Sequence, residues 1–83
     1  MSQTLSLHLE YFAVLREKRG LGKEDISSSA KTPGELYAEL SAKYHFSLPE
    51  KEVRVAVNDE FADWNKPLQN GDRVVFIPPV SGG

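Results

Sequence analysis

The segment from residue 32 to residue 44 constrains the fold most, because it carries a complete set of signals for the start of a helix. Thr32 is a good N-cap, Pro33 stands at the first helical position, and Glu35 completes a capping box three residues after the cap. An apolar stripe with helical spacing follows, made of Leu36, Tyr37, Leu40 and Tyr44. The pattern predicts one amphipathic helix that buries a single face.

The segments on either side of this helix alternate between apolar and polar residues, which is typical of half-buried strands. The alternation assigns these side chains to the core: Leu5, Leu7, Leu9, Tyr11, Val53, Val55, Val57, Val74 and Phe76. Residues 13–19 predict a short helical turn that ends near Gly20. The polar segment around Ile26 predicts an edge strand, and Asn70-Gly71 predicts a tight turn before the last strand.

This order of elements favours an α+β domain. An 83-residue chain has room for one domain with a modest core. Two strands, a crossing helix and further strands follow the order of the ubiquitin-like β-grasp fold, with a mixed sheet of four to five strands and one main helix packed on one face. We expect the last strand to be central, beside the first. Residues 1–78 then form the domain, and residues 79–83 form an extended tail.

Composition excludes several classes of function. The chain has no cysteine, which removes disulfides, thiolate nucleophiles and the cluster of a ferredoxin. The net charge of −2 and the absence of a basic stripe argue against nucleic-acid binding. No apolar run approaches the ~20 residues that span a bilayer, and the first residues lack the features of a signal peptide. We therefore expect a cytoplasmic protein that binds neither nucleic acid nor membrane. His8 and His45 are isolated, so we expect no metal site.

The last six residues, PPVSGG, are unusual for the end of a small domain. Pro78 and Pro79 restrict φ and have no N–H to donate, so we expect the sheet to stop before them. Residues 79–83 extend roughly 16 Å at ~3.3 Å per residue. Gly82 and Gly83 have no side chain, so we expect this end to enter a narrow channel, with the carboxylate of Gly83 as its reactive group. The chain lacks a phosphate-binding loop, so a partner must bind the ATP that activates this carboxylate.

Three stretches of the chain resemble the molybdopterin synthase small-subunit family: YFAVLRE at residues 11–17, AVN at residues 56–58 and GDRVVFIPPVSGG at residues 71–83. The resemblance implies that an adenylyltransferase related to ubiquitin-activating enzymes adenylates the carboxylate of Gly83. A sulfurtransferase or desulfurase then supplies the sulfur of a thiocarboxylate. The tail enters the large synthase subunit and donates this sulfur to a pterin precursor in molybdenum cofactor biosynthesis. The tail residues that this insertion implies are Pro79, Val80, Ser81 and Gly82.

The same resemblance implies how the work is divided between the subunits. This chain is not an enzyme on its own, since the catalytic residues are expected on the large subunit. It binds no cofactor itself, because the activating partner uses the ATP. Two small and two large subunits form a heterotetramer.

An apolar patch near the root of the tail is the expected docking surface for these partners. If the core faces are assigned correctly, Phe12, Phe61, Val75 and Ile77 point away from the core and gather at this end. The alternative is that twist of the sheet buries one or two of them. Arg16 matches the arginine of the early family motif, and it is either an interface cation or a solvated charge at a helix end.

Three other functions fit the same tail. The chain could carry sulfur for thiazole synthesis or tRNA thiolation, or it could be a ubiquitin-like modifier that forms an isopeptide bond through Gly83. The double proline and the resemblance along the whole chain argue against a sulfur carrier of another pathway. The modifier needs the same activation of Gly83 and differs only in the nucleophile that attacks it. The last alternative is an interaction module with an inert tail, which would lose no function when Gly82 and Gly83 are deleted.

Overall fold

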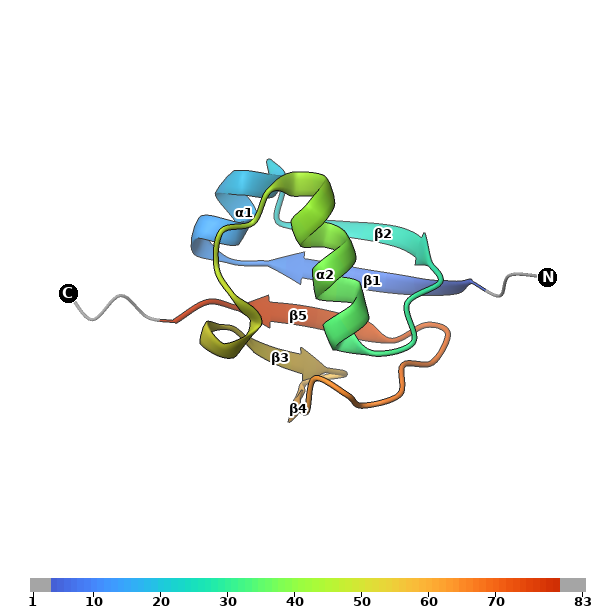
Figure 1. The fold of residues 1–83 in the computed structure, drawn as a ribbon. Coiled ribbons are helices and arrows are strands. Elements are labelled where there is room, and N and C mark those ends of the chain that lie inside the picture. The colour runs from blue at the N-terminus through green and yellow to red at the C-terminus, as the bar shows by residue number, and fades with distance from the viewer. Residues whose placement is uncertain (1–3, 80–83) are drawn as a thin grey trace.

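The computed structural model describes residues 4–79. The elements in chain order are β1 (Leu5–Tyr11), α1 (Ala13–Arg19), β2 (Lys23–Ser28), α2 (Pro33–Tyr44), the 3-10 helix η1 (Glu50–Glu52), β3 (Arg54–Val57), β4 (Glu60–Ala62) and β5 (Arg73–Ile77). The strands form one five-stranded sheet in the order β2-β1-β5-β3-β4. α2 crosses one face of this sheet (Figure 1). The predicted α+β, ubiquitin-like β-grasp fold is therefore confirmed.

The last strand lies at the centre of the sheet, as predicted. β5 pairs in parallel with β1 and antiparallel with β3, so it has a partner on both sides. β2 pairs only with β1 and β4 only with β3, which makes both of them edge strands. β1 and β5 end on the same side of the sheet, where α1 begins (Figure 1). The parallel pairing thus brings the root of the tail next to residues from the start of the chain.

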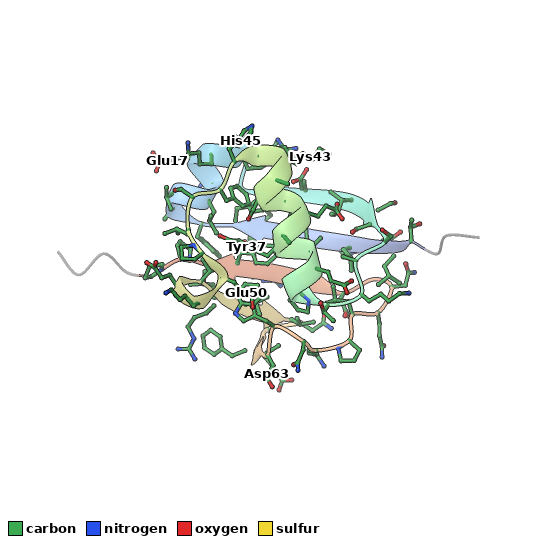
Figure 2. All side chains as sticks on the ribbon, viewed as in Figure 1. Glu17, Tyr37, Lys43, His45, Glu50 and Asp63 are labelled. Atoms are coloured by element: carbon green, nitrogen blue, oxygen red, sulfur yellow. The ribbon has the colours of Figure 1, made fainter. Side chains whose placement is uncertain are left out.

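The main helix begins and packs as its sequence predicts. The Thr32 side chain accepts a hydrogen bond from the Glu35 amide at 3.2 Å, and Glu35 in turn accepts one from the Lys31 amide at 2.8 Å. α2 then packs its apolar face, which includes Tyr37, against the sheet (Figure 2). The centroid of the Tyr37 ring lies 5.4 Å from that of the Phe76 ring. The core consists of Leu7, Leu9, Tyr11, Leu15, Ala30, Leu36, Tyr37, Leu40, Phe46, Val53, Val55, Val57, Leu68, Val74 and Phe76. Leu5 and Tyr44, which the alternation and the helical stripe also placed inside, are only partly buried.

A polar network holds α1 against β2. Arg19, at the end of α1, donates two hydrogen bonds to the Glu24 carboxylate at 2.7 and 2.8 Å, and the Tyr11 hydroxyl donates a third at 2.7 Å. These bonds lower the pKa of Glu24, and the hydrogen bond from Arg19 is the largest cause. Burial and the bond to Glu24 raise the pKa of Tyr11 well above its usual range. The Arg19 guanidinium also lies over the Tyr44 ring, 4.2 Å from its centroid, so the network reaches the end of α2.

Asp72 ties three strands together at the end of the sheet away from the tail. Its carboxylate accepts hydrogen bonds from the Gln69 amide at 2.8 Å and from the Asn58 side chain at 2.9 Å. Its backbone carbonyl accepts a bond from the His8 amide in β1 at 2.9 Å. Asn58 and Asp59 both have positive φ, 52° and 72°, in the two-residue turn between β3 and β4. We call Asn58, Gln69 and Asp72 the Asp72 clasp.

Candidate functional site

The sheet ends where the two prolines begin. β5 stops at Ile77, and of the next two residues Pro78 is buried and Pro79 is exposed. Proline has no N–H, so the strand cannot add another ladder hydrogen bond through these residues. Val80, Ser81, Gly82 and Gly83 lie outside the described residues. Their roles in tail insertion and sulfur transfer, and the division into residues 1–78 and 79–83, therefore stay predictions.

A groove of about 250 Å³ lies on the face of the sheet opposite α2, which we call the open face. It is lined by Glu10, Phe12, Ala56, Asp59, Phe61, Arg73, Val75 and Ile77. Its side chains come from β1, β3, β4 and β5 and from the residues that follow β1 and β3. We call it the tail-root groove, because Ile77 is the last strand residue before the prolines. The structure thus brings together Phe12, Phe61, Val75 and Ile77, as the sequence predicted.

The four apolar residues of this groove differ in exposure. Phe12 is 44% exposed and Phe61 is 64% exposed, so both rings stand out from the surface. Ile77 is half-buried. Val75 faces away from α2 as predicted, but it is only 6% exposed and does not stand out. Its neighbours on the adjacent strands, Glu10 and Ala56, cover it from both sides, because β5 is central.

Charged side chains border the groove on the β1 side. Arg73 reaches the Glu10 carboxylate at 3.4 Å and that of Asp59 at 3.2 Å. Further along the open face, His8 pairs with Asp25 at 2.6 Å. His8 is isolated in the sequence, but the pairing of β1 with β2 places it opposite Asp25. The open face therefore carries charged pairs along β1 and β2, and one of them reaches the turn between β3 and β4 through Asp59.

Arg54 borders the groove on the other side. Its guanidinium carbon lies 4.5 Å from the centroid of the Phe61 ring, within the range of a cation–π interaction. Arg54 pairs with Ile77 in the register of β3 and β5, so both side chains emerge on the open face. Sequence reasoning missed Arg54, Glu10 and Asp59. Their outward positions in the strand alternation were a signal for Arg54 and Glu10, but the cross-strand contacts require the register.

Arg16 does not line the tail-root groove. It is exposed on α1, and a Cβ added at Gly22 would lie 3.3 Å from its Nε atom. The Arg16 side chain therefore lies over the loop after α1. A second hollow does border the prolines, and it is lined by Ala13, Val14, Glu17, Leu48, Pro78 and Pro79. The role of Arg16 as an interface cation stays a prediction, and any such contact would lie outside the tail-root groove.

Residues 4–79 contain no group of three or more His, Cys, Asp or Glu side chains placed to hold a metal ion. Over the same residues, no helix has both the length and the apolar character needed to cross a membrane.

Known proteins match this chain along most of its length. The family model described as the ThiS family matches residues 9–83. A relative from Haemophilus influenzae, named molybdopterin synthase sulfur carrier subunit, is 31% identical over 80 residues, which cover 93% of this chain and 99% of the relative.

Two solved structures share the fold. One is the complex of subunits 1 and 2 of molybdopterin-converting factor from Helicobacter pylori. The matched chain of that complex is 29% identical to this chain, with a TM-score of 0.65, and the match covers 95% of this chain and 100% of that one. The other is SAMP1 from Haloferax volcanii, at 25% identity and a TM-score of 0.74, covering 94% of this chain and 99% of that one. With the family match over residues 9–83 and this shared fold, the chain belongs to the ThiS family.

Proposed function

We propose that this chain is a sulfur carrier that serves as the donor subunit of a molybdopterin synthase. The Gly83 carboxylate is adenylated by an activating enzyme, converted to a thiocarboxylate, and placed in the large subunit, where its sulfur goes to a pterin precursor. The observation that carries the proposal is the family match, which extends through Gly83 itself. The Haemophilus relative, whose name is that of a sulfur carrier subunit, supports it along almost its whole length.

The geometry of the described residues supports this role. A carrier must present its end to one partner for activation and to another for transfer, so it needs a docking surface close to the tail. The tail-root groove meets this need, because Ile77 lines it and the prolines follow directly. Two exposed aromatic rings beside a shallow apolar groove are typical of a protein interface. The complex of subunits 1 and 2 from Helicobacter pylori supports a large-subunit partner.

The proposed chemistry follows from the terminal acyl group. The Gly83 carboxylate attacks the α-phosphate of ATP, pyrophosphate leaves, and an acyl-adenylate forms on the activating enzyme. The terminal sulfur of an enzyme persulfide, on a sulfurtransferase or desulfurase, then attacks the acyl carbon, and AMP leaves with the bonding electrons of the C–O bond. A thiol attacks the enzyme's sulfur in the resulting acyl disulfide, the S–S bond breaks, and the thiocarboxylate leaves with its electrons while the thiol and the enzyme's sulfur form a disulfide. The chain's own contribution is to supply an acyl group without a Cβ. No cysteine of this chain can attack the adenylate, since it has none.

Intact mass spectrometry of the chain purified from its own host tests the proposal. The chain is measured before and after incubation with ATP, the activating enzyme and a sulfur donor. We expect a gain equal to one oxygen replaced by one sulfur, and fragment spectra should place it at Gly83. Oxidation of the single methionine, Met1, gives nearly the same nominal gain, so the position must be read from the fragments. No gain at Gly83 with an active enzyme present would contradict the proposal.

A ubiquitin-like modifier is the second candidate, and the similarity to SAMP1 favours it. The name of that protein expands to small archaeal modifier protein 1. Modifier and carrier share the adenylate, but a lysine amine attacks it in the first case and a sulfur nucleophile in the second. Incubation of the activated chain with a host extract separates the two. Larger adducts joined through Gly83 to lysines of other proteins would favour a modifier, and transfer of sulfur to a pterin by the large subunit would favour the carrier. Activity that survives deletion of Gly82 and Gly83 would leave only an interaction module.

A further inference from the structure

Arg54 and Arg73, the two arginines near the tail-root groove, differ in their charged partners. Arg73 has two carboxylates of its own chain within 4 Å, those of Glu10 and Asp59. Arg54 lies on Phe61, and within residues 4–79 no carboxylate comes within 4.0 Å of its guanidinium. Arg73, in the groove, is thus paired within the chain, whereas Arg54, beside the groove, forms no ion pair within residues 4–79, although Glu60 and Asp63 line the same hollow.

Arg54 also contacts the ring of Phe61, which lines the groove. Phe61 lies in a three-residue edge strand and is 64% exposed, so little else of the chain restrains its ring. The two residues lie diagonally across β3 and β4, a separation that long side chains and aromatic rings can bridge. Phe61 lines the tail-root groove and also the hollow beyond β4, whereas Arg54 lines only the latter. The Phe61 ring thus forms a wall between the tail-root groove and the hollow beyond β4, and the Arg54 guanidinium packs against the ring on the side of that hollow.

A partner that covers the Phe61 ring also removes the Arg54 guanidinium from water. A guanidinium removed from water without a counter-ion destabilises a complex, whereas a carboxylate from the partner would pair with it through two hydrogen bonds. The planar guanidinium can stay on the ring and still donate at its edge, which an ammonium group cannot do as well. The surface therefore fits a partner with an apolar side chain for the groove and a carboxylate just beyond Phe61.

We propose that Arg54 is a specificity-determining residue of the tail-root groove, which selects a large synthase subunit that presents an acidic side chain next to its apolar contact. This proposal rests on the proposed function, because it assumes that the groove docks the large subunit. The role of Arg54 is one of positioning and of charge recognition. It takes no part in the chemistry at Gly83.

The test is the affinity of the large subunit of the same organism for Arg54 variants, measured by calorimetry at low and high salt. We expect Arg54→Gln to weaken binding about 10-fold at low salt and to flatten the salt dependence, because a rim charge pair and a ring contact are lost together. Arg54→Glu should weaken it about 100-fold, since it brings like charges together. Arg54→Lys keeps the charge, so it should keep the salt dependence but recover only part of the affinity.

Lys31→Gln is the matched control, because it removes an exposed cation just before α2, away from the groove lining. The denaturation midpoint of each variant checks that the fold is intact. Equal affinity and salt dependence for wild type and Arg54→Gln would overturn the proposal, and so would an equal loss in Lys31→Gln, since only the net charge of the chain would then matter. Failure of the wild type itself to bind would overturn the proposed function, and the role of Arg54 with it.

Discussion

At the scale of single residues, Glu24 has the most demanding environment that the structure describes. It accepts three hydrogen bonds from Arg19 and Tyr11, and only 13% of its side chain is exposed. A carboxylate in this position is stable only while it is charged and its donors stay in place. The network joins β1, β2 and the end of α1, so it determines where α1 lies.

Glu24 should therefore make the stability of the protein sensitive to acid. The folded chain holds the pKa of Glu24 below its ordinary value of 4.5, so its contribution is fully present above that pH and is lost as the pH falls through the lower, folded-state pKa. We expect Glu24→Gln to lower the free energy of unfolding by about 2 kcal/mol at neutral pH and by much less in acid. Urea unfolding of both proteins across this pH range checks it. Glu52→Gln, at an exposed position in η1, should show no such difference, and a Glu24→Gln effect that is the same at all pH values would contradict the explanation.

Gly83 is the residue on which the proposed chemistry depends. Gly83→Ala places a methyl group beside the acyl carbon, and we expect thiocarboxylate formation to fall at least about 10-fold, as a poorly placed reacting group can cost 100-fold. The midpoint of urea unfolding should not change, because β5 ends earlier, at Ile77. Ser47→Ala, at an exposed position outside the tail, is the control. Normal sulfur loading of Gly83→Ala would show that the enzyme's channel does not require glycine at this position.

At the scale of elements, β5 contributes one face to the core and the other to the tail-root groove. Val74 and Phe76 are fully buried under α2, whereas Val75 and Ile77 line the tail-root groove. The strand alternation links core packing to the lining of the groove, because a shift of register by one residue would exchange the two faces. The antiparallel pairing with β3 and the parallel pairing with β1 fix that register.

Ile77→Lys should separate docking from folding. Ile77 is half-buried on the open face, and its side chain has no place in the core beneath α2. We expect the variant to lose at least about 10-fold in affinity for the large subunit, because a charge replaces an apolar contact at the groove, while its stability falls by less than about 1 kcal/mol. Ser27→Lys, which adds the same charge on β2, should bind normally. A variant that unfolds at the temperature of the binding assay would show that Ile77 belongs to the core.

Much of this arrangement could be predicted from the sequence, because its signals are local. Thr32, Pro33 and Glu35 mark the start of α2 within one turn, and the alternation assigns Val74 and Phe76 to the core. The burial of Val75 was one of the alternatives that the sequence left open, since which of the outward residues is covered depends on neighbours such as Glu10 and Ala56 on the adjacent strands. The contacts of Glu24 and of Arg54 were missed for the same reason: their partners are brought close by strand pairing and by the docking of α1, which only the fold determines.

At the scale of the whole molecule, the Asp72 clasp joins parts of the chain that are far apart in sequence. It connects β1, the turn after β3 and the start of β5 through one carboxylate and its backbone. Asp72 is 9% exposed, so these bonds are shielded from water. Loss of the carboxylate should weaken the turn after β3 and the loop before β5 together, because the Asn58 side chain and the Gln69 amide share this acceptor, whereas the backbone bond to β1 remains.

We expect Asp72→Ala to lower the free energy of unfolding by about 2–3 kcal/mol, because the Gln69 amide and the Asn58 side chain lose their acceptor. A domain of this size has a total of about 4–12 kcal/mol, so the melting temperature should fall clearly. Thermal unfolding followed by circular dichroism measures it. Asp72→Asn keeps one acceptor oxygen and should lose less than alanine does. A variant as stable as wild type would mean that water replaces the clasp at no cost.

The central position of β5 has a consequence for how such a chain is made. β5 is the last strand of the sheet to be synthesised, and until it appears β1 and β3 each lack a neighbour. A product that stops before residue 73 cannot close its core, so quality-control proteases should remove it. Synthesis of β5 is therefore the step that commits the chain to its folded state, because the strands on both sides of β5 are already made when it emerges from the ribosome.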